Sequence, residues 1–566
     1  MRELYKSFFV SIVYACLLLN VAAKAPPSPV YYKTQNTDEW VRRMLRIQRR
    51  YSRVLLVDGA AGHTKSVRVR SLDLNTRNPA PGVDVLYPVN EVYQSLQQAA
   101  DAARGGDLVA VMPGTYAGFV MGDKPDASDG RYIHFKALGK PGECTINRPS
   151  PRDADWMILL QAAHHVIVEG FNIAGATGPG MKPVGPRAGI MLDGDFGRSG
   201  KQAHHIVIVG NFSHNHLKWG LHSTDTHTVL IQDNLFAFSA LEHSAYVSDG
   251  SDNYVIRRNV FFGSRASGLQ CNIDSVSSFH ELLKNPELSS YAKEEPTRAW
   301  ALGLVKLATE KFGANNFPDG RGVNFIIEDN VVNENGKGGA GSFNLAGLQE
   351  SLIQNNLLYG NFNHGIAQWD DANPYDASYV DPGPQSPREV KGPADLPLWG
   401  CHSNVIRNNT VLMGNKGRAA MQSRNGSWGT LMRNNVFIND QPFSIDIFNT
   451  SIFRLDARFN VINSLSYEGM PEALKSLAIA LPEGPSMRSG ITRAKIASEF
   501  VRYGEEPWVI IEGSWWRLNP NRPDFHPRAD SKLLAHRGDA GAMPPRDLLG
   551  SRRRGVSIGA LDPADR

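Results

Sequence analysis

Short apolar runs alternate with polar turn residues along most of this chain, and an asparagine recurs at the same point of each run. The pattern is a few β-branched or aromatic residues, then Asn, then two or three more apolar residues, as in Ile206-Val-Ile-Val-Gly-Asn211-Phe212. Successive copies lie about 25 residues apart, except for two longer intervals that end at Asn330 and Asn409 and have room for insertions. The recurring residues are Asn211, Asn234, Asn259, Asn330, Asn356, Asn409, Asn435 and Asn460. A repeat of this length predicts a solenoid.

The apolar runs are too short for buried helices and are bounded by Gly, Asn, Asp and Ser, so they predict strands. A repeat of about 25 residues holds three short strands and three turns, which suits a right-handed parallel β-helix. We therefore predict an all-β fold of roughly ten to twelve coils. An inward asparagine at the same bend of every coil can hydrogen-bond the turn backbone and stack on its neighbours as an amide ladder.

A helix is expected near the start of the solenoid, where Tyr93–Arg104 is rich in Ala and Gln and ends at a Gly pair. A short apolar strand follows and ends at Pro113-Gly114. Such a helix can cover the open edge of the first coil. The segment Ala99–Tyr116 resembles the opening of secreted β-helix proteins of the pectate-lyase-like superfamily, and the resemblance extends over residues 85–463. It implies the β-helix fold and a polysaccharide partner, and it says little about the reaction.

The chain divides into four predicted regions. Residues 1–23 have a basic start, an apolar run and small residues before Lys24, so they predict a secretory signal peptide. Residues 24–84 form an N-terminal extension with a basic amphipathic helix, residues 85–463 form the β-helix, and residues 464–566 form an irregular capping region. This order predicts a secreted, periplasmic or cell-surface protein with no stable membrane span once the signal is removed.

Two insertions interrupt the predicted coils. Residues 275–320 contain helix-forming stretches, and residues 373–398 are rich in Pro, Asp and Gly and predict an irregular loop. Insertions of a solenoid tend to emerge on one face and to build a binding site there. The aromatic group Trp508, Trp515 and Trp516 of the C-terminal region could cap the far end of the solenoid or offer a stacking surface to sugar rings, and capping is favoured.

The charge and the cysteine content limit the classes of partner and the ways in which the fold can be stabilised. The formal net charge is +4, and charged residues of both signs make up 20% of the chain, which argues against nucleic acid as a partner. Beyond the predicted signal, Cys144, Cys271 and Cys401 are far apart and odd in number, so no disulfide framework is expected. We expect a monomer stabilised by the stacking of its coils.

A second set of strands lies between the asparagine runs and predicts a sheet whose outer face carries stacked polar residues. These strands are Gly189–Asp193, Gly220–His222, Ala245–Asp249, Gly268–Asn272, Ser342–Asn344, Gly365–Asp371, Ala420–Arg424 and Ser444–Asp446. We expect this face to be the substrate groove.

The groove residues are compatible with β-elimination on a uronate-containing polysaccharide. In that reaction a base removes the proton α to a carboxylate, and a cation neutralises the carboxylate so that this proton becomes acidic. The acidic residues Asp193, Asp249 and Asp274 could hold Ca²⁺ for this purpose, although no cofactor is evident from a motif. The candidates for the base or for a protein-borne neutralising cation are Lys218, His222 and Arg424.

Hydrolysis of a glycosidic bond is the alternative chemistry. It needs one carboxylic acid to protonate the leaving oxygen and one carboxylate to activate water. The pair Asp370 and Asp371, next to Trp369, is the first choice, and the pair resembles that of polygalacturonase-type hydrolases. The Asn-Thr-Asp, Gly-His-Gly and Arg-Ile-Lys signatures of those enzymes are absent here.

Two histidine pairs precede strands at the same coil position. His164-His165 and His204-His205 predict a stacked repeat feature, because the spacing and acidic partners of a zinc site are not visible around them.

The sequence therefore predicts a polysaccharide-degrading β-helix protein, with a lyase favoured over a hydrolase through the family resemblance. A non-catalytic carbohydrate-binding module of the cell surface remains the alternative from another class.

Overall fold

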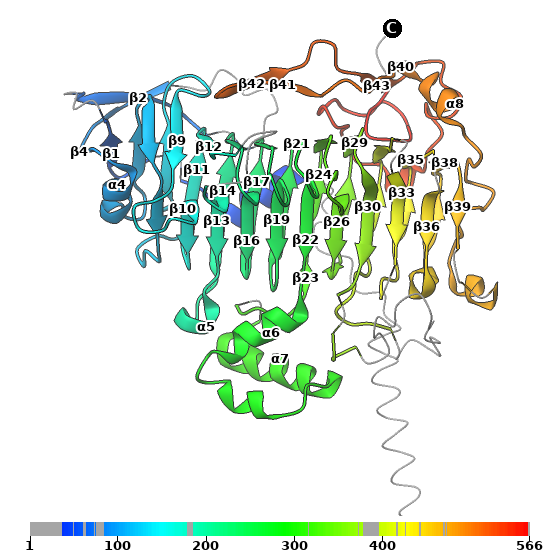
Figure 1. The fold of residues 1–566 in the computed structure, drawn as a ribbon, viewed down its shortest axis with the longest axis horizontal. Helices are drawn as coiled ribbons and strands as arrows, with labels where there is room; N and C mark the ends of the chain where they lie inside the picture. The colour runs from blue at the N-terminus through cyan, green and yellow to red at the C-terminus, as the bar shows by residue number, and fades with distance from the viewer. Residues whose placement is uncertain are drawn as a thin grey trace, which may run out of the picture.

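The computed structural model describes residues 37–563, apart from 49, 60–63, 73, 75–83, 178–184, 315, 372, 377–395, 415–416, 425, 441–442, 468–469 and 471. Its body is a stack of coils with three long parallel sheets, one of 13 strands and two of 11 (Figure 1). The 13-stranded sheet is sheet 1, and the two 11-stranded sheets are sheets 2 and 3. Each coil contributes one strand to sheet 1, then one to sheet 3, then one to sheet 2, and each strand pairs with the equivalent strand of the next coil. The predicted right-handed parallel β-helix is confirmed. The predicted signal peptide lies outside the described residues.

Sheet 1 consists, in spatial order, of β4 (Glu91–Tyr93), β1 (Val54–Val57), β5 (Leu108–Val111), β8 (Ile133–Ala137), β11 (His164–Glu169), β14 (Ala203–Val209), β17 (Thr226–Gln232), β20 (Asp252–Arg257), β24 (Ile326–Glu328), β28 (Leu352–Gln354), β31 (Val405–Arg407), β34 (Leu431–Arg433) and β37 (Asp456–Arg458). Sheet 3 consists of β6 (Gly114–Ala117), β9 (Cys144–Arg148), β12 (Asn172–Ala174), β15 (Phe212–His214), β18 (Leu235–Ala237), β21 (Val260–Phe262), β25 (Val331–Asn333), β29 (Leu357–Tyr359), β32 (Thr410–Leu412), β35 (Val436–Ile438) and β38 (Val461–Ile462).

Sheet 2 contains the predicted groove strands. It consists of β7 (Phe119–Met121), β10 (Trp156–Gln161), β13 (Ala188–Asp193), β16 (Trp219–Thr224), β19 (Ala245–Ser248), β22 (Leu269–Asn272), β26 (Gly341–Ala346), β30 (Asn363–Trp369), β33 (Gly417–Ser423), β36 (Phe443–Ile447) and β39 (Leu465–Ser466). One inward side chain of each strand joins a continuous core between the three sheets, for example Leu221, Val247 and Cys271.

The recurring asparagines form the predicted ladder at the turn from sheet 1 to sheet 3. The Asn234 Oδ1 atom accepts from the backbone N–H of Asn211 at 2.9 Å and from its Nδ2 at 3.1 Å. The same two bonds repeat between each successive pair up to Asn460. Because each backbone N–H of the row from Asn211 to Asn435 has an amide partner, the ladder removes a desolvation cost that the bend would otherwise carry.

The residue before each ladder asparagine has a left-handed backbone. Asp233, Asp329 and Asn355 have φ values of 55°, 61° and 55°, and Gly210 has 66°. Asn, Asp and Gly tolerate this conformation better than other residues, which explains why they recur there. Arg258 and Phe459 adopt the same conformation before Asn259 and Asn460, with φ values of 56° and 57°, so the preceding residue type is a preference and not a requirement.

Two helices from the N-terminal part of the chain pack on the solenoid. The helix α4 (Leu96–Ala102) is capped by Ser95 and packs on the first coil, as predicted. The helix α3 (Thr37–Leu45) lies on the outer face of sheet 1, where Val41 and Leu45 are buried. An antiparallel pair, β2 (Ser66–Arg70) and β3 (Asp84–Pro88), adjoins this region.

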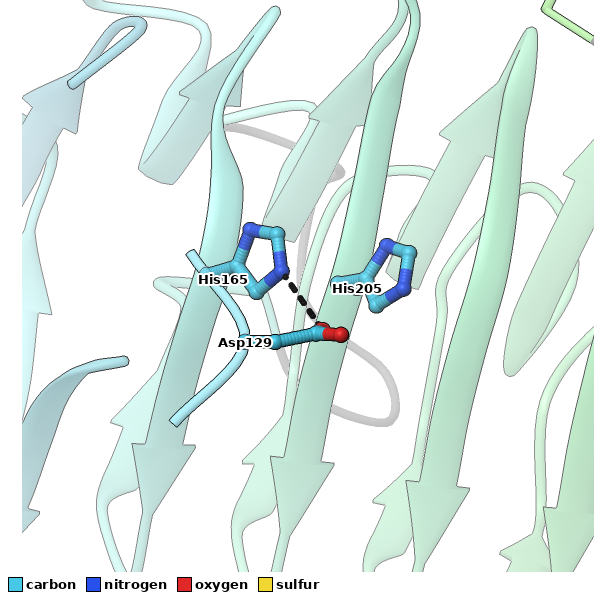
Figure 2. A group of neighbouring side chains, drawn as sticks. All are labelled: Asp129, His165 and His205. Carbon is cyan, nitrogen blue, oxygen red and sulfur yellow. Dashed lines mark hydrogen bonds and ion pairs between the residues drawn. The ribbon is translucent and has the colours of Figure 1, made fainter. Parts of the chain in front are cut away.

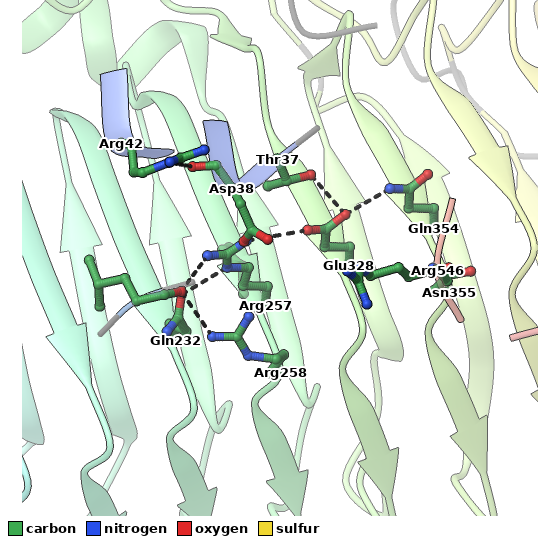
Figure 3. A network of polar contacts seen from close by, with 12 residues as sticks. Thr37, Asp38, Arg42, Gln232, Arg257, Arg258, Glu328, Gln354, Asn355 and Arg546 are labelled. Atoms are coloured by element: carbon green, nitrogen blue, oxygen red, sulfur yellow. Dashed lines mark hydrogen bonds and ion pairs between the residues drawn. The ribbon is translucent and has the colours of Figure 1, made fainter. Parts of the chain in front are cut away.

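A buried arginine fixes α3 to sheet 1 (Figure 3). The Arg257 guanidinium donates to Asp38 Oδ1 at 2.8 Å and to Gln232 Oε1 at 2.8 Å, and only 2% of its side chain is exposed. Thr37 Oγ1 donates to Glu328 Oε2 at 3.1 Å on the next strand of the sheet. Because a buried guanidinium is costly without partners, removal of Asp38 would destabilise this docking.

The first insertion is helical, as predicted. It contains α6 (Ser275–Leu283), the 3₁₀ helix η1 (Ser289–Lys293) and α7 (Arg298–Phe312), and it packs with α5 (Phe196–Ser199) below the sheets in Figure 1. Its apolar cluster includes Tyr375 and Trp399 from the described ends of the second insertion. The short strands β23 (Gly322–Val323) and β27 (Leu348–Gln349) pair beside it. Most of the second insertion lies outside the described residues.

The C-terminal region returns along the outer face of sheet 3. It contains η5 (Glu472–Leu477), α8 (Arg493–Ala497), the antiparallel pairs β40 (Phe500–Arg502) with β43 (Asp524–Pro527) and β41 (Val509–Glu512) with β42 (Trp515–Leu518), and η6 (Ala540–Ala542). A further 3₁₀ helix, η4 (Asn449–Ile452), precedes β37. Trp508 is 6% exposed and packs against Tyr359 of β29, so it covers the outer face of sheet 3 and does not offer a surface for sugar stacking. The prediction that it caps the far end of the solenoid is wrong, because β29 lies three strands before the last strand of this sheet. The described cysteines are free and buried.

Candidate functional site

The outward face of sheet 2 carries a row of polar and aromatic side chains at one register position. The row runs through Met191, His222, Tyr246, Gln270, Asn344, Ala367, Gln422 and Asp446. All eight predicted groove strands belong to this sheet. The parallel register therefore places side chains from distant parts of the chain next to one another.

The centre of the row is a stack of rings. His222 lies 4.8 Å from Tyr246 with nearly parallel planes, and its ring is 4.4 Å from Trp219. Trp219 in turn stacks on Trp156 at 6.4 Å. His222, Tyr246 and Trp156 are half-buried, so their outer edges face solvent.

Two cations lie at the edge of this stack where the strands begin. The Lys218 ammonium is 5.0 Å from the Trp219 ring, and the Arg187 guanidinium lies over Trp156 and Trp219 at 5.4 and 5.6 Å. Lys218 is also 3.6 Å from Glu242, and Arg187 is 3.9 Å from Asp155. Both ion pairs are partly exposed and therefore weak, so an acidic sugar can compete for the two cations beside the flat apolar rings.

His222 is a neutral imidazole in this setting. Burial lowers its pKa to about 3, with further contributions from the nearby charges of Arg187 and Lys218. Its Nε2 atom is 3.3 Å from Ser248 Oγ. Burial raises the pKa of the Tyr246 hydroxyl above its ordinary value, so this group is protonated at neutral pH. The pair thus combines a proton acceptor with a proton donor.

Carboxylates gather where the strands of sheet 2 end. Asp249 accepts from Thr224 Oγ1 at 2.7 Å and from Ser248 Oγ at 3.2 Å, and burial, with the charge of Asp274, raises its pKa to about 6. Asp193 accepts from Gln161 Nε2 at 3.1 Å, and burial raises its pKa.

A cleft of about 570 Å³ opens between these carboxylates and the insertion helix α6. Its lining includes Asp193, Asp195, Asp225, Asp249 and Glu281, with Arg198 and Lys284 as cations. The acidic and the cationic parts of the face thus lie at opposite ends of the strands of sheet 2.

Asp274 and Asp371 adjoin this acidic end. Asp274 is the N-cap of α6, and its carboxylate accepts from the N–H groups of Val276 and Ser277. Burial and the charge of Asp274 raise the pKa of Asp371, and the Asn272 side chain partly offsets the rise.

The remaining predicted residues lie elsewhere. Asp370 is 4% exposed and turns away from the groove beneath the second insertion, where Asn373 Nδ2 donates to it at 3.4 Å. Burial raises its pKa well above the ordinary value. Arg424 stays on sheet 2 but is occupied by Asp446, whose Oδ2 accepts from Nη2 at 2.7 Å and from Nε at 3.2 Å.

The structure does not bring the three predicted calcium ligands into one tight group. Within the described residues, one set of three His, Cys, Asp or Glu side chains has ligand atoms within 4.8 Å of one another, and it is Asp129 with His165 and His205. Asp193, Asp249 and Asp274 share only the acidic end of the face.

Sequence reasoning missed Tyr246, Arg187 and Trp219. Tyr246 occupies the outward position two residues before Ser248, so strict alternation along its strand could have selected it. Arg187 precedes a strand in a region without a clear pattern, and its contact with Trp219 depends on coil pairing. No local signal identifies such a contact.

The fold and the groove define a right-handed parallel β-helix with a polar, partly aromatic face on one sheet. No protein-family model matches the sequence, and no curated protein is significantly similar to it. Among the described residues, no helix is long and apolar enough to cross a membrane.

Several solved structures resemble the coiled architecture at low identity. Pectate lyase Pel9A has 12% identity and a TM-score of 0.44, with 91% of this chain and 97% of that chain covered. Alginate lyase from Paenibacillus sp. str. FPU-7 has 13% identity and a TM-score of 0.37, with 64% and 96% covered. The AlgE6 A-module, a mannuronan C-5 epimerase of Azotobacter vinelandii, has 12% identity and a TM-score of 0.29, with 69% and 92% covered. At these values the likeness carries no reaction or substrate over to this chain.

Proposed function

We propose that this protein is a polysaccharide lyase that cleaves a uronate-containing polymer by β-elimination on the outer face of sheet 2. The observation that carries the proposal is the neutral His222 stacked on Tyr246, with Lys218 and Arg187 at the adjacent edge. An acid–base pair beside two cations is the set of groups that elimination α to a carboxylate requires.

Each group has a definite role in the proposed step. Lys218 and Arg187 pair with the uronate carboxylate, which acidifies the C5 proton of the sugar. His222, as a neutral imidazole, accepts the C5 proton on the ring nitrogen that carries no proton, as the C4–C5 double bond forms. The C4–O bond breaks, and the Tyr246 hydroxyl gives its proton to the leaving oxygen.

Substrate binding tunes the base in this scheme. The charges of Arg187 and Lys218 contribute to the low pKa of His222. A bound carboxylate offsets both charges and raises this pKa, so the imidazole becomes a better base when the polymer is present. The proposal also includes Ca²⁺ at the acidic end, where Asp193, Asp249 and Asp274 lie without forming one tight group, as the neutralising charge for a carboxylate bound at that end of the strands.

Hydrolysis is the second candidate, and a specific observation favours it. Asp249 has a pKa raised to about 6, which suits a general acid, and Asp371 lies on the same face as a candidate base. In this pair Asp249 takes the place of Asp370, because Asp370 is buried away from the groove.

The test measures two products at once. The purified chain is incubated with polyuronates and neutral polysaccharides, with Ca²⁺ or a chelator, while ultraviolet absorbance of unsaturated ends and reducing ends are followed together. A lyase raises both signals, and a chelator-sensitive rise supports the calcium role. Reducing ends alone establish the hydrolase, and silence with retained binding leaves the carbohydrate-binding module.

Variants identify the groups. His222→Gln and Tyr246→Phe should each lower kcat by about 10²–10⁴-fold with little change in polymer binding, because they remove a proton-transfer group and preserve size. His526→Gln, on the C-terminal strand β43, is the matched control and should keep full activity. Full activity in His222→Gln would refute the assignment of the base.

We further propose that the chain is exported and acts as a monomer, on the basis of the apolar segment within residues 1–23 and the absence of a need for a partner in the scheme. Cell fractionation and light scattering of the mature protein test these two points.

A further inference from the structure

A cluster of five histidines and two aspartates lies where the strands of sheet 1 begin, outside the groove described above. His164 and His204 stack at 4.9 Å, His204 and His227 stack at 4.9 Å, and His165 and His205 stack at 4.5 Å. The predicted stacking of the histidine pairs is therefore confirmed. The acidic partners that the sequence did not reveal come from the loop before β8, which contributes Asp123 and Asp129.

We propose that Asp129, His165 and His205 form a binding site for Zn²⁺ or a similar divalent transition-metal ion (Figure 2). The ligand atoms of the three side chains all lie within 4.8 Å of one another. His165 Nε2 is 3.3 Å from Asp129 Oδ1. Two ligands that each lie about 2.0 Å from a tetrahedral Zn²⁺ are about 3.3 Å apart, so this pair already has the edge length of such a site.

Proton counting within the histidine pair supports a cation. The pair makes three polar contacts: His164 Nδ1 with His165 Nδ1 at 2.9 Å, His164 Nε2 with Asp123 Oδ1 at 2.9 Å, and His165 Nε2 with Asp129 Oδ1 at 3.3 Å. Two neutral imidazoles carry two protons, so one of the three contacts has no proton to share and brings two lone pairs together. A metal ion between His165 Nε2 and Asp129 would leave the two protons for the other two contacts.

In the metal-bound arrangement His165 Nδ1 donates to His164, and His164 Nε2 donates to Asp123. Such a chain from ligand histidine to carboxylate is the usual support of a metal-bound imidazole.

The second histidine pair repeats the arrangement. His205 Nδ1 is 2.8 Å from His204 Nδ1, which leaves His205 Nε2 for the metal. Arg46 Nη1 pairs with Asp129 Oδ2 at 3.2 Å and leaves Oδ1 for the ion. The His165 side chain is 9% exposed and that of Asp129 is 46% exposed, so the site is shielded by the coils and open on one side for entry and for a solvent ligand.

The donor set selects the class of ion. Two imidazoles and one carboxylate suit Zn²⁺, Co²⁺, Ni²⁺ and Cu²⁺, whereas Ca²⁺ and Mg²⁺ prefer oxygen ligands alone. Bound metal would link two neighbouring coils, through β11 and β14, to the loop at Asp129 and, through Arg46, to the end of α3. We therefore expect it to stabilise the N-terminal half of the solenoid.

Calorimetric titration of the chelator-treated full chain with Zn²⁺ alone tests the site. The expected result is one ion per chain, a raised Tm, and no comparable response to Ca²⁺ or Mg²⁺. Co²⁺ should give the visible absorption bands of a low-symmetry four-coordinate ion. A wild-type chain without a saturable Zn²⁺ heat would overturn the proposal.

Variants separate ligation from folding. Asp129→Asn changes an exposed side chain and should fold normally yet lose the Zn²⁺ heat and the Co²⁺ bands, as should His205→Gln. Asp126→Asn, another exposed aspartate of the same loop, is the matched control and should bind as the wild type. His164→Gln should weaken binding by about 10–100-fold, as loss of a supporting hydrogen bond does. Unchanged binding in both Asp129→Asn and His205→Gln would show an adventitious ion elsewhere and refute the site.

Discussion

A single amide of the ladder supports two coils at once. Asn330 is fully buried, and its Oδ1 accepts from the backbone N–H of Asn259 at 3.0 Å while its Nδ2 donates to Ile256 O at 2.9 Å. The side chain thus satisfies backbone groups of the preceding coil, and its neighbour Asn356 does the same for the coil of Asn330.

Replacement of Asn330 by Ala should destabilise the protein by about 1–3 kcal/mol for each buried group left without a partner. Chemical denaturation followed by tryptophan fluorescence measures this loss. Asn316→Ala, an exposed asparagine after α7, should change stability by less than about 0.5 kcal/mol. Equal effects of the two variants would mean that the ladder contributes nothing beyond a turn preference.

The raised pKa of Asp249 makes stability depend on pH. The folded chain keeps a proton on this carboxyl between its ordinary pKa of 3.8 and about 6, where the unfolded chain has released it. The extra free energy of unfolding that comes from this protonation is fully present below pH 3.8 and is lost as the pH rises through about 6. At neutral pH the charged Asp249 carboxylate therefore lowers the stability of the fold. A residue that costs stability in this way is expected where it serves a function.

Replacement of Asp249 by Asn should therefore raise stability at pH 7 by on the order of 2 kcal/mol and leave it nearly unchanged near pH 4. Thermal unfolding at both pH values provides the measurement. The exposed Asp530→Asn is the control and should show no such difference. A lower Tm for the Asp249 variant at pH 7 would contradict the inference that the charged carboxylate destabilises the fold.

At the scale of elements, the insertion helices form a unit with its own core. Phe279 of α6 is fully buried and lies 6.0 Å from Trp300 of α7 and 4.9 Å from Tyr375. The helices contribute side chains to the acidic cleft, such as Glu281, so their packing also positions one wall of the candidate site.

Replacement of Phe279 by Ala should cost about 3–5 kcal/mol, taken mainly from the local stability of the insertion. Limited proteolysis should then cut between residues 284 and 320 much faster, while the coils stay protected in hydrogen exchange. Leu302→Ala, at a position 49% exposed on α7, should leave the cutting rate unchanged. Uniform loss of protection over the whole chain would show that the insertion and the coils unfold together.

The elements that could be predicted from the sequence are those whose signal is local. The ladder asparagines and the strands between them repeat a pattern that each coil contains in full, so coil register followed from it. The helices of the first insertion were visible in their apolar spacing. The strands of the predicted groove were correctly assigned to one sheet, because their outward positions alternate with core positions.

The rest depends on contacts between distant segments. The burial of Asp370 is decided by residues 373–376 and 396–400, which fold over it, and not by its neighbours in the strand. Asp129 meets His165 only because a loop of one coil reaches the next strand. The sequence pattern around each residue contains no trace of either contact.

At the scale of the whole molecule, the C-terminal region covers the outer face of sheet 3 along the side of the solenoid. Sheet 3 has apolar residues on both faces, since Leu235, Val331 and Leu357 point outward while their neighbours in the strand join the coil core. The strands accordingly show continuous apolar runs, as expected for a sheet covered on both sides. Leu534 and Ile558 of the C-terminal region are fully buried against this outer face.

A chain that ends at residue 489 should therefore expose the outer face of sheet 3 along several coils and self-associate. Light scattering and binding of a hydrophobic dye should both increase, while the parallel coils themselves keep their circular dichroism, because the ladder and the inner core are intact. Leu534→Ala should reproduce part of the effect, with a loss of about 2–5 kcal/mol, whereas Leu549→Ala, 47% exposed, should have none. A shortened chain that stays monomeric with an unchanged Tm would mean that the coils need no lateral cover, and that the C-terminal region is retained for a binding role.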